Sequence, residues 1–114
     1  MLEQTVSRTR RFNSRIETSD GVWVYWYCSG RAETSRVENV GLGGVFVTTA
    51  TARPVGASAE MHFLVQEGQI RTQAVVRHVD KGRGIGLKFT AVKDEDRPRL
   101  ARLMNRARSL SQEK

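Results

Sequence analysis

Two short groups of residues in this sequence have side chains suited to binding an anionic ligand. The first is an arginine-rich segment that contains Arg10, Arg11 and Arg15. The second is a glycine-rich turn that begins at Asn39 and ends at Gly44. An arginine fork can donate two hydrogen bonds to a phosphate or a guanine edge, and such a turn exposes backbone N–H groups. Together they favour a phosphate-bearing partner, with a solvated basic tail as the simpler interpretation of the arginines alone.

Other residues that often carry chemistry lack a suitable context. His62 and His78 lie sixteen residues apart in strand patterns without a companion cysteine, so we expect structural histidines rather than metal ligands. Cys28 is the single cysteine, which excludes an internal disulfide and a cysteine-based zinc site. The glycines of residues 82–86 do not open a helix, as a phosphate loop would. The sequence therefore predicts a protein that is not an enzyme, with no metal site and no cofactor.

The net charge of +7 is concentrated at the two ends of the chain. Lysine and arginine total 19 of the 114 residues against 12 acids, and 15 of the 19 are arginine. Residues 1–15 carry +3 and residues 97–108 carry +5, whereas residues 16–96 carry −1. The middle of the chain is therefore near-neutral, and the basic ends favour an anionic partner.

The length and hydropathy of the chain predict one cytoplasmic domain. A chain of 114 residues can bury a single core without disulfides or metal. No apolar run is longer than residues 21–28, which argues against a signal peptide and a membrane-spanning helix.

Six strands are predicted from alternation, strand-forming residues and intervening turns. They span residues 21–28, 31–38, 44–49, 58–66, 70–80 and 84–90. Residues 66–69 are expected to form a short hairpin loop. In the last strand, Gly84 and Gly86 lie on one face and leave space for a neighbouring backbone or aromatic ring.

The first strand has two apolar faces. One carries Trp23, Tyr25 and Tyr27, and the other carries Val22, Val24, Trp26 and Cys28. Both faces must be at least partly covered, one by the core and the other by a lid.

After Val92 the apolar residues recur at helical spacing instead of alternating, and this pattern predicts an amphipathic helix over residues 94–110. Asp94 or Asp96 is expected to be the N-cap, and Pro98 falls in the first turn. The arginines between the apolar positions suit solvation and the helix dipole. These elements predict an all-β fold, a six-stranded antiparallel β-barrel with the C-terminal helix on one opening or flank.

Three features in order resemble the PilZ domain family over nearly the whole chain. Arg11-x-x-x-Arg15 precedes the first strand, a turn from Asn39 to Gly44 follows, and the last strand reads Gly-Ile-Gly-Leu-Lys-Phe at residues 84–89. In that family, Arg-x-x-x-Arg and Asp/Asn-x-Ser-x-x-Gly motifs bind the bacterial second messenger cyclic di-GMP. The resemblance implies a six-stranded antiparallel barrel with a C-terminal helix, which agrees with the periodicity.

The resemblance also implies a role for each motif residue. Arg11 and Arg15 would bind the phosphates and guanine edges of cyclic di-GMP, and Asn39 would hydrogen-bond a guanine. Gly44 would keep the turn open for the base. Arg10 would add one more guanidinium, which suits a second, stacked ligand molecule.

On this basis we expect residues 1–114 to form a single PilZ-like domain. It would comprise a flexible arginine-rich arm at 1–20, a barrel at 21–92 and the helix at 94–110. Cyclic di-GMP would order the arm over the barrel and so change the surface that a protein partner meets. The sequence leaves a homo-oligomer possible and does not identify the partner.

One departure from the family pattern keeps alternatives open. Gly41 stands where the family usually has serine, and losing one such hydrogen bond costs about 1 kcal/mol, or roughly five- to tenfold in affinity. The first alternative is a degenerate PilZ interaction module that does not bind the nucleotide. The second is a small basic barrel that binds nucleic acid and stacks bases on Trp23, Tyr25 and Tyr27. We expect those rings to suit core packing better, which makes nucleic acid the less favoured partner.

Overall fold

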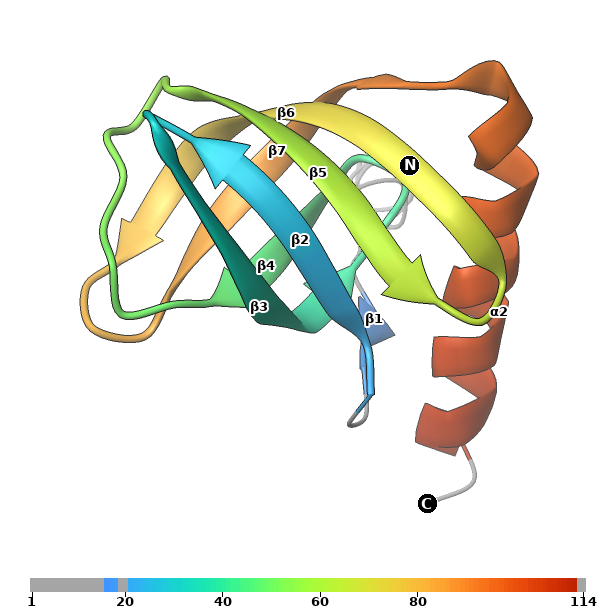
Figure 1. Ribbon diagram of the computed structural model, residues 1–114. Helices are drawn as coiled ribbons and strands as arrows, with labels where there is room; N and C mark the ends of the chain where they lie inside the picture. Colours follow the sequence, from blue (N-terminus) through green and yellow to red (C-terminus); the bar gives the residue numbers. More distant parts are fainter. Residues whose placement is uncertain (1–15, 19–20, 113–114) are drawn as a thin grey trace, which may run out of the picture.

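The computed structural model describes residues 16–18 and 21–112 of the chain (Figure 1). The strands are β1 (Ile16–Glu17), β2 (Trp23–Cys28), β3 (Arg31–Val40), β4 (Gly44–Thr48), β5 (Ser58–Val65), β6 (Gly68–Asp80) and β7 (Gly84–Val92). A 3-10 turn, η1 (Asp94–Asp96), leads into the helix α2 (Arg97–Gln112).

Strands β2 to β7 form a closed antiparallel barrel of six strands. They are hydrogen-bonded in the order β3-β2-β5-β6-β7-β4, and a further pairing of β3 with β4 closes the sheet. The short β1 pairs with the end of β3. The predicted fold class, a six-stranded antiparallel barrel with a C-terminal helix, is therefore confirmed.

Element boundaries differ from the prediction by a few residues, and the β5–β6 connection is tighter than expected. Val65 pairs with Gly68, so the hairpin loop consists of two residues rather than the four of 66–69. Gly68 adopts a φ of 120°, a conformation that favours glycine and permits so tight a turn.

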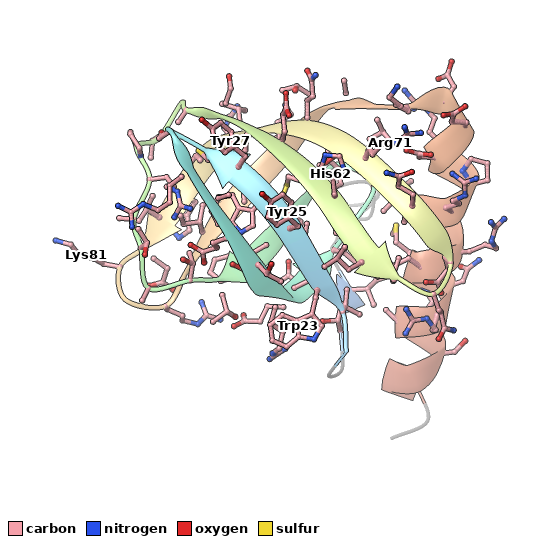
Figure 2. All side chains as sticks on the ribbon, in the orientation of Figure 1. Trp23, Tyr25, Tyr27, His62, Arg71 and Lys81 are labelled. Carbon is pink, nitrogen blue, oxygen red and sulfur yellow. The ribbon has the colours of Figure 1, made fainter. Side chains whose placement is uncertain are left out.

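The two faces of β2 have different environments. Val24, Trp26 and Cys28 are fully buried in the core. Trp23, Tyr25 and Tyr27 project outward from the front of the barrel and are 43%, 46% and 50% exposed (Figure 2). No helix or strand within residues 16–18 and 21–112 lies over this outer face (Figure 1). The preference for core packing was therefore wrong for these three rings, because the register of β2 turns Trp26 inward instead.

A buried arginine lies at the end of the barrel away from α2. Arg53 is 4% exposed, and its guanidinium carbon lies 4.3 Å from the centre of the Trp26 ring. Its Nη2 also lies 3.2 Å from Glu33 Oε1. Ser35 accepts a hydrogen bond from Trp26 Nε1 at 2.9 Å and donates one to Glu33 Oε2 at 2.7 Å. This network satisfies the polar groups that would otherwise be costly to bury.

The helix α2 packs its apolar side against the barrel. Leu100, Leu103, Met104 and Ala107 are buried, and the first three join the core cluster. The described helix is not long and apolar enough to cross a membrane.

Charged contacts connect η1 and the beginning of α2 to the start of β6. Asp96 is fully buried and accepts hydrogen bonds from Arg71 N at 2.9 Å, Arg71 Nε at 3.1 Å and Arg99 Nη1 at 2.7 Å. Asp94 is not the N-cap of η1, because that position is Lys93, which has no side-chain cap hydrogen bond. Asp96, the other predicted N-cap, directly precedes α2. The carboxylate of Asp96 joins the helix to the sheet.

A second ion pair fixes the middle of α2 to the β5–β6 hairpin. Arg106 donates from Nε and Nη2 to the two carboxylate oxygens of Glu67, at 2.6 and 3.0 Å. These hydrogen bonds are the main reason why the pKa of Glu67 is lowered and that of Arg106 is raised. Two of the helix arginines, Arg99 and Arg106, therefore dock the helix in addition to suiting its dipole.

Candidate functional site

The second motif forms the turn between β3 and β4. Asn39 lies near the end of β3, and Gly44 is the first residue of β4. Gly41 N donates to Gly44 O at 2.9 Å, and Phe89 N donates to Gly43 O at 2.9 Å. The structure thus brings Asn39, Gly41 and Gly44 together. The other predicted site residues, Arg10, Arg11 and Arg15, lie outside the described residues.

The short strand β1 lies beside the same turn. Ile16 pairs with Val40 and Glu17 pairs with Asn39. Thr18 N continues this contact by donating to Glu38 O at 2.9 Å. These residues fall within the segment 1–20 that sequence analysis assigned to the arm. Their pairing fixes where the chain reaches the barrel, directly next to Asn39.

A β-bulge in β3 determines how Asn39 is presented. The register against β4 shifts between Val37 and Asn39. Val37 and Val40 are both fully buried, although residues three apart on a regular strand point to opposite faces. The bulge resolves this conflict by inserting one extra residue. As a result, Glu38 and Asn39 both lie between the buried Val37 and Val40, and neither of them belongs to the core cluster.

Phe46 and Arg83 support the turn from the neighbouring strands. Phe46 pairs with Asn39 on one side and with Gly86 on the other. A Cβ at Gly84 would collide with the backbone oxygen of Val47 and lie 2.5 Å from Phe46 Cε1, so only glycine admits the neighbouring backbone and the ring there. The predicted close approach of an aromatic ring to this glycine face is confirmed.

Arg83 covers the Phe46 ring and connects it to β3. Its guanidinium carbon lies 4.8 Å from the ring centre, and its Nη2 lies 2.7 Å from Glu38 Oε1. Its Nη1 lies 2.8 Å from Asp80 Oδ2, and this hydrogen bond, followed by the charge of Glu38, raises the pKa of Arg83. The ion pair between Arg83 and Glu38 could not be predicted from the sequence, because the two residues are 45 positions apart.

The side-chain oxygen of Asn39 is unsatisfied. Asn39 Oδ1 is buried and has no hydrogen-bond partner within residues 16–18 and 21–112. Buried polar atoms in folded proteins nearly always have a partner, and an exception calls for an explanation such as an absent ligand or water. Asn39 is thus a free acceptor at the position where the sequence predicts a contact with the ligand.

An open groove of about 690 Å³ lies on the front of the barrel, away from this turn. Its lining includes Tyr25, Thr34, His62, Leu64 and Gln69. Figure 2 shows His62 beside Tyr25 on this face, in agreement with their direct pairing. Within residues 16–18 and 21–112, no group of three His, Cys, Asp or Glu side chains could hold a metal ion.

The PilZ domain family model matches residues 9–106, which span both motifs, the barrel and most of α2. The chain belongs to the PilZ domain family. PilZ domains are receptor and effector modules, and the family includes receptors for cyclic di-GMP. Among curated proteins, no sequence matches this PilZ domain significantly.

Solved structures share the fold of this PilZ domain. The Bacillus subtilis inhibitor of motility MotI/DgrA is 21% identical with a TM-score of 0.71, over 89% of this chain and 53% of that chain. K. pneumonia MrkH in its apo state is 16% identical with a TM-score of 0.68, over 88% of this chain and 52% of that one. The PilZ domain of YcgR from Escherichia coli, solved with c-di-GMP, is 15% identical with a TM-score of 0.70, over 88% of this chain and 92% of that domain.

The present chain therefore spans about half the length of MotI/DgrA and MrkH. It corresponds in extent to the isolated PilZ domain of YcgR.

Proposed function

We propose that this PilZ domain is a receptor for cyclic di-GMP whose site combines the arginine segment with the Asn39 turn. The observation that carries the proposal is the pairing of Ile16 with Val40 and of Glu17 with Asn39. Arg15 is bonded directly to Ile16, and consecutive Cα atoms are about 3.8 Å apart. The end of the first motif is thus tethered to the second by the covalent chain.

The two motifs supply complementary chemistry for a cyclic dinucleotide. Arg11 and Arg15 offer cationic forks to its two phosphates and to the acceptor edges of its guanines. Asn39 Oδ1 is an acceptor without a partner and suits the N–H groups of a guanine. Arg10 adds a further donor for a second ligand molecule. Gly44, at the start of β4, keeps a side chain away from the turn where the base would lie.

In this proposal, ligand binding is the signal. Cyclic di-GMP would fix residues 1–15 against the barrel and create a surface that a partner protein in the cytoplasm recognises. Gly41 lacks the usual serine hydroxyl, so we expect binding that is roughly five- to tenfold weaker than with serine.

Isothermal titration with cyclic di-GMP tests the proposal. We expect the wild type to bind and Arg11→Ala, Arg15→Ala and Asn39→Ala to bind at least about tenfold more weakly, because each loses a charge-assisted or buried hydrogen bond. Arg31→Ala is the matched control, since Arg31 is an exposed arginine at the opposite end of β3. No binding by the wild type would refute the proposal, and a partner pull-down unaffected by the nucleotide would then support the degenerate interaction module.

The outward placement of Trp23, Tyr25 and Tyr27 favours nucleic acid as a second candidate, because exposed rings along one strand can stack bases. The surrounding charge argues against it. Tyr27 pairs with the acidic Glu60, and the nearby Arg71 is engaged by Glu95 and Asp96. Binding of single-stranded RNA with a steep salt dependence, and without competition from cyclic di-GMP, would favour this candidate over the first.

A further inference from the structure

A second unsatisfied polar atom lies on the same strand as Asn39. Arg36 is partly buried, and its Nη1 is buried without a hydrogen-bond partner in the part of the chain that the structure describes. Both acids of β3 are paired with other arginines, Glu33 with Arg53 at 3.2 Å and Glu38 with Arg83 at 2.7 Å. The guanidinium of Arg36 therefore keeps a donor that its strand does not satisfy.

The unsatisfied donor and the unsatisfied acceptor are close enough to serve one ligand. Asn39 lies three positions after Arg36, which corresponds to about 10 Å along a strand. The long Arg36 side chain can span much of that distance. A guanine carries acceptors at O6 and N7 along one edge and an N–H donor at N2 on the other. One free donor and one free acceptor match these two edges.

An aromatic ring lies directly beside Arg36. Trp23 pairs with Arg36 across β2 and β3, and the Cβ atoms of such a pair are about 5 Å apart. Trp23 is on the outer face of the barrel at the lower end of β2 (Figure 2), and its ring is partly open to solvent. A flat ring beside a guanidinium can stack a base while the guanidinium binds the edge of that base.

We propose that Arg36 and Trp23 form a guanine-reading subsite in which Arg36 donates to O6 and N7 of a base stacked on Trp23. This inference rests on the proposed function, because the guanine is one of the two in cyclic di-GMP. The arm arginines hold the phosphates and the other guanine, whereas Arg36 belongs to the folded barrel and reads the base that is stacked on Trp23. A phosphate contact alone would leave the adjacent Trp23 ring without a role.

The test compares cyclic di-GMP with its analogue in which N7 of each guanine is replaced by C–H. We expect the wild type to bind the analogue about tenfold more weakly, because one hydrogen bond of a bidentate pair is lost. Arg36→Met should weaken binding of cyclic di-GMP at least about tenfold and should discriminate between the two ligands less than the wild type does, because only the contacts of the arm arginines with N7 remain. Arg36→Lys should retain part of the discrimination, because an ammonium group can still donate to N7 but lacks the planar fork.

Two matched controls accompany these variants. Arg31→Met removes the same charge from the same strand, about 17 Å from Arg36, and should keep both the affinity and the discrimination. Trp23→Leu should weaken both ligands alike by about tenfold, whereas Tyr27→Leu, on the same face of β2, should not. Thermal unfolding confirms that each variant is folded.

The outcomes separate the subsite from the receptor function. Binding by the wild type together with an Arg36→Met variant that prefers cyclic di-GMP to the analogue by the same factor as the wild type would overturn the subsite and leave the receptor function intact. Equal weakening of both ligands by Arg36→Met, with the preference retained, would assign Arg36 to a phosphate and would also overturn it. Absence of binding by the wild type would refute both proposals.

Discussion

Asp96→Asn should weaken the attachment of α2 to the barrel and lower the stability of the whole domain. Asp96 is fully buried, and its two oxygens accept hydrogen bonds from Arg71 and Arg99. Asparagine keeps one of these oxygens and turns the other into an NH₂ group that faces donors. The substitution therefore removes the negative charge from between two guanidinium groups while leaving the shape of the side chain unchanged.

The expected cost follows from these contacts. Removing one partner of a buried ion pair costs about 3–5 kcal/mol, but the side chains of Arg71 and Arg99 are 28% and 36% exposed and can be rehydrated. We therefore expect the free energy of unfolding to fall by about 3 kcal/mol. For a domain of this size, that corresponds to a decrease in Tm of roughly 12 °C.

The effect should depend on pH. The hydrogen bond from Arg71 is the main cause that lowers the pKa of Asp96, and the charge of Arg99 adds to it. A carboxylate whose pKa is lowered by folding stabilises the protein fully above its unfolded pKa of about 3.9. That contribution is lost as the pH falls through the lower, folded value. The difference in unfolding free energy between wild type and Asp96→Asn should thus be constant from about pH 7 to 5 and shrink below about pH 4.

Denaturant and thermal unfolding, followed by circular dichroism at several pH values, measure this difference. Asp94→Asn is the matched control, because the Asp94 side chain is 99% exposed and forms an exposed ion pair with Arg97, at 3.2 Å. It should leave Tm nearly unchanged. A Tm for Asp96→Asn within about 3 °C of the wild type at pH 7 would refute the reasoning, as would an equal loss in Asp94→Asn.

Two further substitutions test the turn and its support. Gly41→Ser restores the hydroxyl that is usual in the family and should raise the affinity for cyclic di-GMP about five- to tenfold by isothermal titration; unchanged affinity would mean that the hydroxyl makes no contact with the ligand. Gly84→Ala should lower the free energy of unfolding by about 1–3 kcal/mol, because its Cβ would collide with the backbone oxygen of Val47 and with the Phe46 ring. Gly43→Ala, where a Cβ would meet nothing within 4 Å, is the control in the same unfolding assay, and an equal cost at both positions would contradict the steric explanation.

Local pattern in the sequence was sufficient for the elements and for half of the candidate site. Alternation along β2 and the helical spacing of Leu100, Leu103 and Met104 predicted the strand and the helix, because each depends on which side chains share one face of a short segment. The order of the motifs likewise identified Asn39, Gly41 and Gly44, which are close in sequence and remain close in the structure.

Tertiary structure decided which face of each strand points inward. The sequence showed two apolar faces on β2, and only the pairing with β3 and β5 turns Trp26 to the core and Trp23 to the surface. The bulge at Val37 and Asn39 was equally hidden, because two buried valines three residues apart are consistent with either an irregular strand or a turn.

The charged side chains show most clearly which features a sequence pattern predicts and which only the fold reveals. Composition alone could describe the arginines only as a basic surface, since their partners lie far away in the chain. Arg83 binds Glu38, Arg106 binds Glu67, and Arg71 binds Asp96, over separations of 45, 39 and 25 residues. Periodicity and motif order report on neighbours in sequence, so they were enough to predict the barrel, the helix and the family resemblance. Strand register brings distant residues into contact, so the ion pairs become visible only in the folded chain, as do the polar atoms of Arg36 and Asn39 that have no partner among the described residues.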